Sequence, residues 1–238
     1  MRVFVFVAAL MLSASLAVGV DVHDGFDAIL HERVADGLVD YAGIKQHDAA
    51  KLDAYLDQLA SVDLEKLTRD EQLAYYLNLY NATTIKAVID RLHDDYSPAE
   101  KDFAVFKEPL VRVAGGQISL NHLEHQVIRR QFKDPRVHVA LVCAARSCPP
   151  ILNRAYRAND LDKVLDENMK RFVTDAARNQ IDDEKRELRL SKIFEWYSLD
   201  FGGEEAVPAY VARYAANDVA GYRVSYLEYD WKLNARRP

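Results

Sequence analysis

The sequence predicts an α+β fold, a helix-rich single domain with a small, largely antiparallel sheet and β-hairpins. Two observations lead to this class. Long segments repeat apolar residues at helical spacing, as Leu52, Tyr55, Leu56 and Leu59 do. The segments that suit strands are short, and most are joined by turns rather than by crossover helices. Helices combined with short, hairpin-linked strands are typical of an α+β fold.

Helices account for most of the predicted elements. Apolar residues at helical spacing, together with Ser191 as a possible cap for the last helix, predict helices over residues 26–36, 48–60, 70–92, 120–132, 161–176 and 191–196.

The predicted strands lie between these helices. A glycine pair predicts a hairpin over residues 112–118, and a charged turn predicts a second hairpin between Ile181 and residues 188–190. The continuous apolar run over residues 137–142 suggests a buried strand, and residues 222–229 alternate like a last strand.

The composition is that of an ordinary globular protein. Half of the 238 residues are apolar, 29% are charged, and the formal net charge is −6. A mildly acidic surface has no electrostatic attraction for nucleic acid or for an anionic membrane, so neither partner is expected. No linker, repeat or low-complexity tract interrupts residues 20–238, which we expect to form a single globular domain.

Residues 1–19 have the pattern of a cleavable signal peptide. Arg2 supplies the positive charge, Val3–Leu12 is an apolar run too short to span a bilayer, and small residues follow, among them Ala17 and Gly19. An uncleaved membrane anchor is the alternative. No later stretch is long and apolar enough to cross a membrane, so the processed chain is predicted to be periplasmic or secreted, without an integral membrane span.

The long predicted helix carries amides where apolar residues are expected. Asn81 falls near the middle of the apolar arc, and Asn78 lies one turn earlier, toward its edge. A buried amide without partners costs about 1–3 kcal/mol, so Asn81 must be hydrogen-bonded. It either orients a catalytic group or ligand, or it ties the backbone of a neighbouring loop.

The helix over residues 120–132 carries a carboxylate in the same way. Glu124 projects through the centre of its apolar face, and His125 lies toward the edge. A carboxylate at a core position must be paired, hydrogen-bonded or protonated, and such environments also produce general acids and bases. Glu124 is therefore a candidate site residue, with a structural tie to an arginine or tyrosine as the alternative. His125 alone is a weaker candidate.

The third feature runs from His138 to Cys148. If residues 137–143 form one strand, His138 and Cys143 point to opposite faces, and Cys143 lies at the strand's end, where a reactive side chain can be presented. Arg146 nearby favours a thiolate. Four interpretations of Cys143 and Cys148 are open. The pair could form a disulfide, or Cys143 could be a catalytic thiol with a histidine as base. Alternatively, both cysteines bind metal with His138, or both are inert. The oxidising compartment expected for an exported protein favours the disulfide, and the spacing of the cysteines does not match the usual paired ligands of a metal site.

Several of these residues belong to motifs that resemble an uncharacterised family, domain of unknown function 547. The segments that carry the resemblance are Tyr76–Lys86, Leu120–His125, Asp134–Pro150, Leu190–Phe201 and Tyr229–Asn234. The similarity extends from about Val34 to Asn234, and Tyr76 stands where the family motif suggests tryptophan. The resemblance implies no established reaction. It does imply that Asn81, Glu124 and the segment from His138 to Cys148 form one spatial unit, and that the protein is exported.

Three functional hypotheses follow. In the first, an exported thiol-dependent hydrolase or acyl transferase uses catalytic Cys143, His138, His125, Glu124 and Asn81. In the second, a non-catalytic binding module holds a small molecule or peptide, and a structural disulfide joins the two cysteines. In the third, the cysteines perform thiol–disulfide exchange, although their spacing is longer than in Cys-x-x-Cys motifs.

No cofactor or metal is expected. The further residues expected to bind a ligand are Asn78, Tyr80, Arg146, Ser147 and Asp200.

Overall fold

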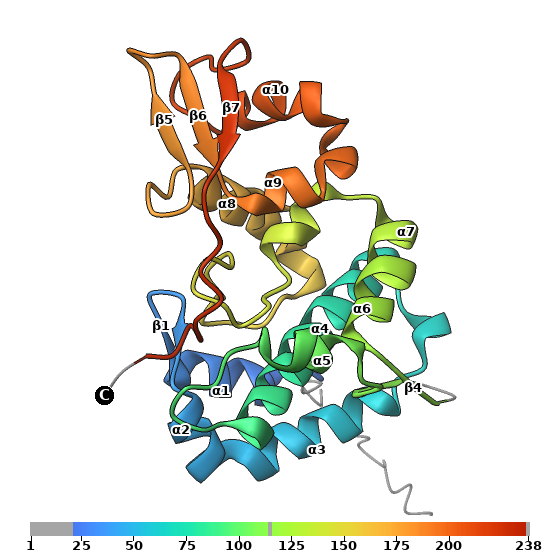
Figure 1. The fold of residues 1–238 in the computed structure, drawn as a ribbon. Coiled ribbons are helices and arrows are strands. Elements are labelled where there is room, and N and C mark those ends of the chain that lie inside the picture. The colour runs from blue at the N-terminus through green and yellow to red at the C-terminus, as the bar shows by residue number, and fades with distance from the viewer. Residues whose placement is uncertain (1–20, 114–115, 237–238) are drawn as a thin grey trace, which may run out of the picture.

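A computed structural model describes residues 21–113 and 116–236 (Figure 1). The predicted signal peptide, residues 1–19, lies outside these ranges. Within them the α+β prediction is confirmed, because most elements are helices and the strands form small two- and three-stranded sheets.

Helices occupy all six segments that the apolar spacing predicts, with ends shifted by a few residues, and three unpredicted helices lie over residues 41–43, 100–107 and 207–212. They are α1 (Asp24–Arg33), α2 (Tyr41–Gly43), α3 (Ala49–Ala60), α4 (Arg69–Arg91), α5 (Glu100–Lys107), α6 (Leu120–His122), α7 (Arg129–Phe132), α8 (Leu161–Val173), α9 (Lys192–Trp196) and α10 (Val207–Ala212).

Two of the helix junctions are π-helical. Residues Ile44–Asp48 join α2 to α3, and Leu123–Ile128 join α6 to α7, so that the predicted helix over residues 120–132 is continuous. Ser119 caps this helix, since its side chain accepts a hydrogen bond from the backbone of His122. π-helical turns inside helices often occur at functional sites, and this one carries Glu124.

The strands form three sheets within the described ranges. β1 (Val34–Ala35) pairs with β2 (Leu38–Val39), and β3 (Val111–Val113) pairs with β4 (Gly116–Ile118), both antiparallel. β5 (Gln180–Asp182) pairs antiparallel with β6 (Glu187–Leu190), which also pairs with β7 (Arg223–Tyr226) in parallel. Both predicted hairpins are confirmed. The first hairpin, β1–β2, was not predicted; it turns at Asp36 and Gly37, which both have positive φ.

The strand predicted over residues 137–142 is wrong. Asp134 caps a 3₁₀-helix, Pro135–Val139, and the following residues form irregular turns. The run is apolar because it is buried, and its backbone groups find partners in side-chain amides instead of a neighbouring strand. The amide of Asn81 donates to the carbonyl of Ala140 (2.9 Å) and accepts from the N–H of Val142 (2.9 Å).

The described chain has two clusters of buried apolar side chains. One surrounds α4, which is buried along most of its length between α3 and the π-helical segment Leu123–Ile128. The other lies between α8 and the sheet β5–β6–β7, with α9 and α10 around it. In Figure 1 the sheet and α8–α10 form the upper part of the molecule, and α1–α5 form the lower part.

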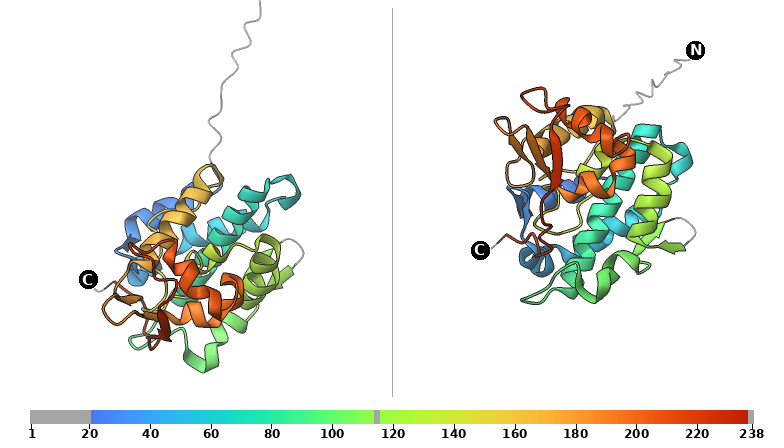
Figure 2. Two further views of the ribbon diagram at one scale, coloured as in Figure 1. Left: turned by 90° about the horizontal axis from the view of Figure 1, so that it is seen from above. Right: turned by 45° about the horizontal axis from the view of Figure 1, so that its top comes forward.

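The C-terminal segment connects these two parts. After β7 it runs down to the first hairpin, where the N–H of Val39 donates to the carbonyl of Asn234 and the N–H of Arg236 donates to the carbonyl of Val39 (Figure 1; Figure 2). On the way it hydrogen-bonds to the loop that contains the two cysteines, through the N–H of Arg146 to the carbonyl of Lys232 (2.8 Å).

Candidate functional site

The two cysteines are joined, as the compartment argument predicted. The Cα atoms of Cys143 and Cys148 are 6.2 Å apart, within the range of a disulfide, and the intervening chain turns through Ala144 with a φ of 63°. The N–H of Cys143 donates to Sγ of Cys148 at 2.8 Å. Cys148 is buried, with 2% of its surface exposed, whereas Cys143 is only half-buried.

Two helices place a carboxylate beside this disulfide. Tyr80 projects from α4 and Glu124 from the π-helical segment, and the Tyr80 hydroxyl donates to Oε2 of Glu124 at 3.3 Å. Burial, followed by the charge of Glu124, raises the pKa of both Tyr80 and Tyr197 well above the usual range. Both phenols therefore stay protonated and can donate hydrogen bonds.

Aromatic side chains from three distant segments complete the wall. Trp196 at the end of α9 stacks on Trp231 of the C-terminal segment, with ring centroids 5.9 Å apart, and Tyr229 contacts both rings. Phe103 of α5 packs edge-on against Trp231 at 4.7 Å. Trp196 is 47% exposed, so the wall is open to solvent on its side.

These groups enclose two adjoining cavities. The larger, which we call the aromatic cavity, has a volume of about 320 Å³ and is lined by the rings of Tyr80, Phe103, Phe106, Trp196, Tyr197 and Trp231 and by the polar groups of Lys107, Asn121, Glu124 and Cys143. The smaller, which we call the inner cavity, has a volume of about 70 Å³; His138, Cys143 and Cys148 all line it.

His138 belongs to a separate polar cluster behind Tyr197. Its Nε2 lies 2.7 Å from Oδ2 of Asp200, and its ring stacks on Tyr197 with centroids 3.8 Å apart. Arg129 donates two hydrogen bonds to Asp200, at 2.7 and 3.0 Å. The hydrogen bond from His138, supported by Arg129, holds the pKa of Asp200 below its usual range.

Glu124 is the unusual charge of the site. Its side chain is 10% exposed, and in the described part of the chain its one salt-bridge partner is His125, whose Nδ1 is 3.9 Å away. Nδ1 of His125 also lies 3.0 Å from Nη1 of Arg129, which donates a hydrogen bond to it. Buried carboxylates are normally paired with a cation, because an unpaired buried charge is costly. Here the carboxylate faces a cavity, accepts the hydroxyl of Tyr80 and has no lysine or arginine partner among the described residues.

Of the residues predicted for the site, the structure brings together Tyr80, Glu124, His138 and Cys143 around the two cavities, with Asp200 behind His138. The others lie elsewhere or are committed to the backbone. Asn78 binds the N–H and carbonyl of Tyr156, Asn81 binds the loop over residues 140–142, and His125 is half-exposed beside Arg129.

Arg146 and Ser147 hold the C-terminal segment. Arg146 is exposed, and its N–H donates to Lys232. The hydroxyl of Ser147 accepts the N–H of Asp230 at 2.8 Å. Both residues position Tyr229 and Trp231 against the disulfide, and neither side chain lines the aromatic cavity.

The sequence reasoning did not identify the aromatic wall. Phe103, Trp196, Tyr229 and Trp231 come from three segments that no local spacing relates. A signal did exist, since the chain has only two tryptophans, Trp196 and Trp231, and both lie in motifs that carry the family resemblance.

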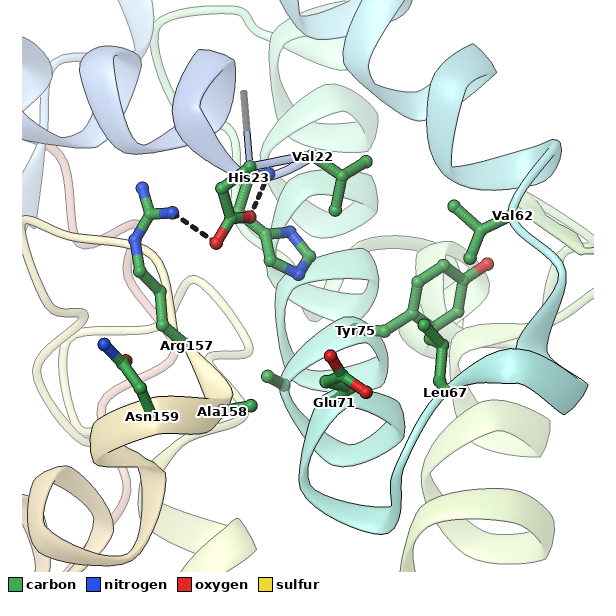
Figure 3. A pocket seen from close by; sticks show the side chains of 11 residues that line it. Val22, His23, Val62, Leu67, Glu71, Tyr75, Arg157, Ala158 and Asn159 are labelled. Carbon is green, nitrogen blue, oxygen red and sulfur yellow. Dashed lines mark hydrogen bonds and ion pairs between the residues drawn. The ribbon is translucent and has the colours of Figure 1, made fainter. Parts of the chain in front are cut away.

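A larger cavity, of about 480 Å³, lies on another side of the molecule, between α1, α4 and the segment after Tyr156 (Figure 3). Its charged groups and its histidine already have partners. Arg157 pairs with Asp21 at 2.7 Å, and Nδ1 of His23 is 2.7 Å from the hydroxyl of Tyr55. Glu71 accepts the backbone N–H of Thr68 in the capping box of α4. The aromatic cavity, where Glu124 has no lysine or arginine partner among the described residues, is therefore the stronger candidate.

The helices of residues 21–113 and 116–236 include none with the length and apolar character that a membrane crossing requires.

Comparisons with known proteins identify one family. Residues 64–173 match the family model described as "Protein of unknown function, DUF547". The match includes Tyr80, Glu124, His138 and both cysteines, but the motifs after residue 173 lie outside it. No curated protein and no solved structure matches the chain. Over residues 64–173, the chain is therefore similar to the DUF547 family of proteins of unknown function.

Proposed function

We propose that this protein is an exported binding module whose aromatic cavity takes the cationic group of a small molecule or peptide. The observation that carries the proposal is Glu124, a buried carboxylate that faces a cavity walled by aromatic rings and has no lysine or arginine partner among the described residues. Aromatic rings attract cations through their π faces, and aromatic cages are a known means of binding ammonium groups.

The rest of the cavity supports this ligand class. The hydroxyl of Tyr80 donates to Glu124 and keeps the carboxylate oriented. Lys107 also lines the cavity, but its ammonium group pairs with Asp102 at 2.6 Å and forms no salt bridge with Glu124. A volume of about 320 Å³ suits a short apolar stem that ends in an ammonium group, which agrees with a small molecule or the side chain of a peptide.

Export is part of the proposal and is supported by two features. Residues 1–19 have the charge, apolar run and small residues of a signal peptide. The disulfide between Cys143 and Cys148 suits an oxidising compartment, where such bonds persist.

The experiment is a titration of the exported protein with n-butylammonium, followed by intrinsic fluorescence. The protein is recovered from outside the cytosol of cells that express the full chain, and its mass is expected to lack residues 1–19. Because both tryptophans, Trp196 and Trp231, line the aromatic cavity, fluorescence reports directly on it. Saturable binding of n-butylammonium, with weaker binding of n-butanol and of butyrate, is the expected result.

Two variants make the titration specific. Glu124→Gln keeps the shape and removes the charge, and we expect it to weaken n-butylammonium binding by about tenfold or more, since a charge-assisted hydrogen bond contributes about 1.5–3 kcal/mol. Glu205→Gln removes a charge from an exposed position and is expected to bind as the wild type does. Equal affinity for the amine, the alcohol and the acid would refute cation recognition.

A second candidate function applies only to the reduced protein. His138 and Cys143 line the same inner cavity, and Asp200 holds Nε2 of His138, so these three groups resemble a thiol–histidine–carboxylate arrangement. In the disulfide form Cys143 has no thiol to attack with. Turnover of an activated ester by the reduced protein, and not by the oxidised protein, is the test of thiol-dependent hydrolysis or acyl transfer.

A further inference from the structure

We propose that the Cys143–Cys148 disulfide undergoes thiol–disulfide exchange with small cationic thiols that enter the aromatic cavity. The inference rests on the proposed function for its choice of cation, because the carboxylate and the disulfide share this cavity. It assigns a reaction to a bond that a purely structural role would keep away from any ligand.

The position of the disulfide is the first observation. Cys143 lines both the aromatic cavity and the inner cavity, whereas Cys148 lines only the inner one. Cys143 is half-buried and Cys148 is 2% exposed. A thiolate in the aromatic cavity therefore reaches Sγ of Cys143 and not Sγ of Cys148. Which sulfur is attacked depends on such access.

The hydrogen bonds around the two sulfurs are the second observation. The N–H of Cys143 donates to Sγ of Cys148 at 2.8 Å, so a donor is already in place for negative charge on the leaving sulfur. The hydroxyl of Tyr229 lies 3.3 Å from Sγ of Cys143 and can donate to that sulfur once it is released. Stabilisation of Cys148 as the leaving group favours attack at Cys143 in the first step, and the Tyr229 hydroxyl acts in the second step, when Cys143 is itself released.

The reaction balances without a further reagent. A thiolate RS⁻ attacks Sγ of Cys143, the bond between the two cysteine sulfurs breaks, and Cys148 leaves as a thiolate that takes up one proton. A second thiolate then attacks the R sulfur of the mixed disulfide and releases Cys143 as a thiolate. The protein disulfide is reduced to two thiols and two RSH are oxidised to RSSR; RSSR reverses both steps.

Glu124 gives the substrate class. It lines both cavities together with Cys143, so a thiol whose ammonium group binds at Glu124 brings its sulfur close to the disulfide. An aminothiol with a short spacer combines the two groups. A neutral or anionic thiol of the same size lacks the attraction to the carboxylate, and an anionic one is repelled.

The experiment compares reduction of the oxidised wild type by cysteamine and by 2-mercaptoethanol, two thiols of similar size that differ in charge. Reaction is stopped with acid and alkylating agent, and intact mass counts the free thiols over time. The ratio of the two rate constants, cysteamine over 2-mercaptoethanol, is compared between proteins, since this cancels the intrinsic reactivity of each thiol. We expect the ratio in the wild type and in Glu205→Gln to exceed that in Glu124→Gln about tenfold.

A second arm identifies the attacked sulfur. Cys148→Ser, shown to be folded by its melting transition, is treated with cystamine, and Cys143→Ser is treated in the same way. We expect the mixed disulfide to form on Cys143 at least about tenfold faster than on Cys148. The wild-type kinetics need no cysteine substitution, so they test exchange with cationic thiols even if these variants do not fold.

Three results would overturn the inference. The disulfide could resist both thiols until the protein is unfolded in urea, which would make it purely structural; binding of n-butylammonium would then leave the proposed function intact. The ratio of the rate constants for cysteamine and 2-mercaptoethanol could be the same in Glu124→Gln as in the wild type. If the wild type also fails to bind n-butylammonium, cation recognition itself is refuted. Faster adduct formation on Cys148 would contradict the assigned point of attack.

Discussion

Single buried amides determine the shape of the loop beneath the site. Asn81 supplies one donor and one acceptor to residues 140–142, and Asn168 donates to the carbonyl of Val139 at 2.6 Å. Asn78 donates to the carbonyl of Tyr156 and accepts from its N–H. Each amide replaces the partner that a neighbouring strand would have given. Of the two interpretations of Asn81, these contacts favour the tie to a neighbouring loop.

Asn81→Ala is therefore expected to destabilise the protein strongly. It leaves the buried carbonyl of Ala140 and the buried N–H of Val142 without their partner, and each loss costs about 1–3 kcal/mol. We predict a decrease of about 2–4 kcal/mol in the free energy of unfolding, measured by urea denaturation. Asn217→Ala, at an exposed amide that binds Asp183, is the control and should change stability by less than about 0.5 kcal/mol. Equal small effects at both positions would contradict this role.

The sequence revealed those site residues that break a local pattern. Asn81 and Glu124 were found because each interrupts an apolar helical face, and a helical wheel shows this directly. Tyr197, Tyr229 and Trp231 interrupt nothing in their own segments. Their importance depends on contacts with residues far away in the chain, which local spacing cannot indicate.

One element, α5, holds an unusual backbone next to the aromatic cavity. Lys101, Asp102 and Phe103 have φ of 49°, 55° and 59°, so three consecutive residues without glycine adopt the left-handed conformation. Such residues cost about 1–2 kcal/mol each and persist only where the surroundings favour them. Here the turn directs Phe103 onto Trp231 and so closes one side of the aromatic cavity.

Replacing a strained residue by glycine should stabilise this element. We predict that Lys101→Gly raises the free energy of unfolding by about 0.5–1 kcal/mol, since glycine adopts positive φ without steric cost. The matched control is Lys163→Gly, at an exposed position inside α8, which should lower stability by about 1 kcal/mol. A decrease in both variants, seen by urea denaturation, would show that the left-handed turn is not strained.

Elements with local signals were predicted well. The turn residues indicated both the β3–β4 and the β5–β6 hairpins, and Ser191 caps α9 as expected. The segment over residues 137–142 was misassigned because a continuous apolar run indicates burial and does not distinguish a strand from a buried irregular segment. The parallel pairing of β7 with β6 depends on the path of the chain between them, which has no local signature.

For the molecule as a whole, the buried His23 and the partly exposed Asp200 link stability to pH. Burial lowers the pKa of His23 from 6.5 to about 4, so the folded state leaves this ring neutral where the unfolded state binds a proton. The unfolded state thus binds more protons between pH 6.5 and 4, and stability falls as the pH decreases through that window. Asp200 has a lowered pKa, so its contribution is present above pH 3.8 and is lost only at lower pH.

The two contributions can be separated by substitution. We expect His23→Asn to flatten the stability profile between pH 6.5 and 4, removing a decrease of about 2–3 kcal/mol. Asp200→Asn should leave that window unchanged and flatten the profile below about pH 4. Urea denaturation at a series of pH values measures both. A His23→Asn profile that runs parallel to the wild type throughout would refute the assignment.

The C-terminal segment also bears on when the protein can fold. Residues 230–236 fasten the cysteine loop and the first hairpin, yet the ribosome adds them after all the elements that they join. A growing chain without them lacks the partners of Ala144, Arg146 and Ser147, and the loop between the cysteines stays open. We therefore expect the cysteine loop to reach its native shape only after synthesis has passed this segment. The same delay leaves oxidation of the two thiols to whichever environment the chain has reached when it finally closes.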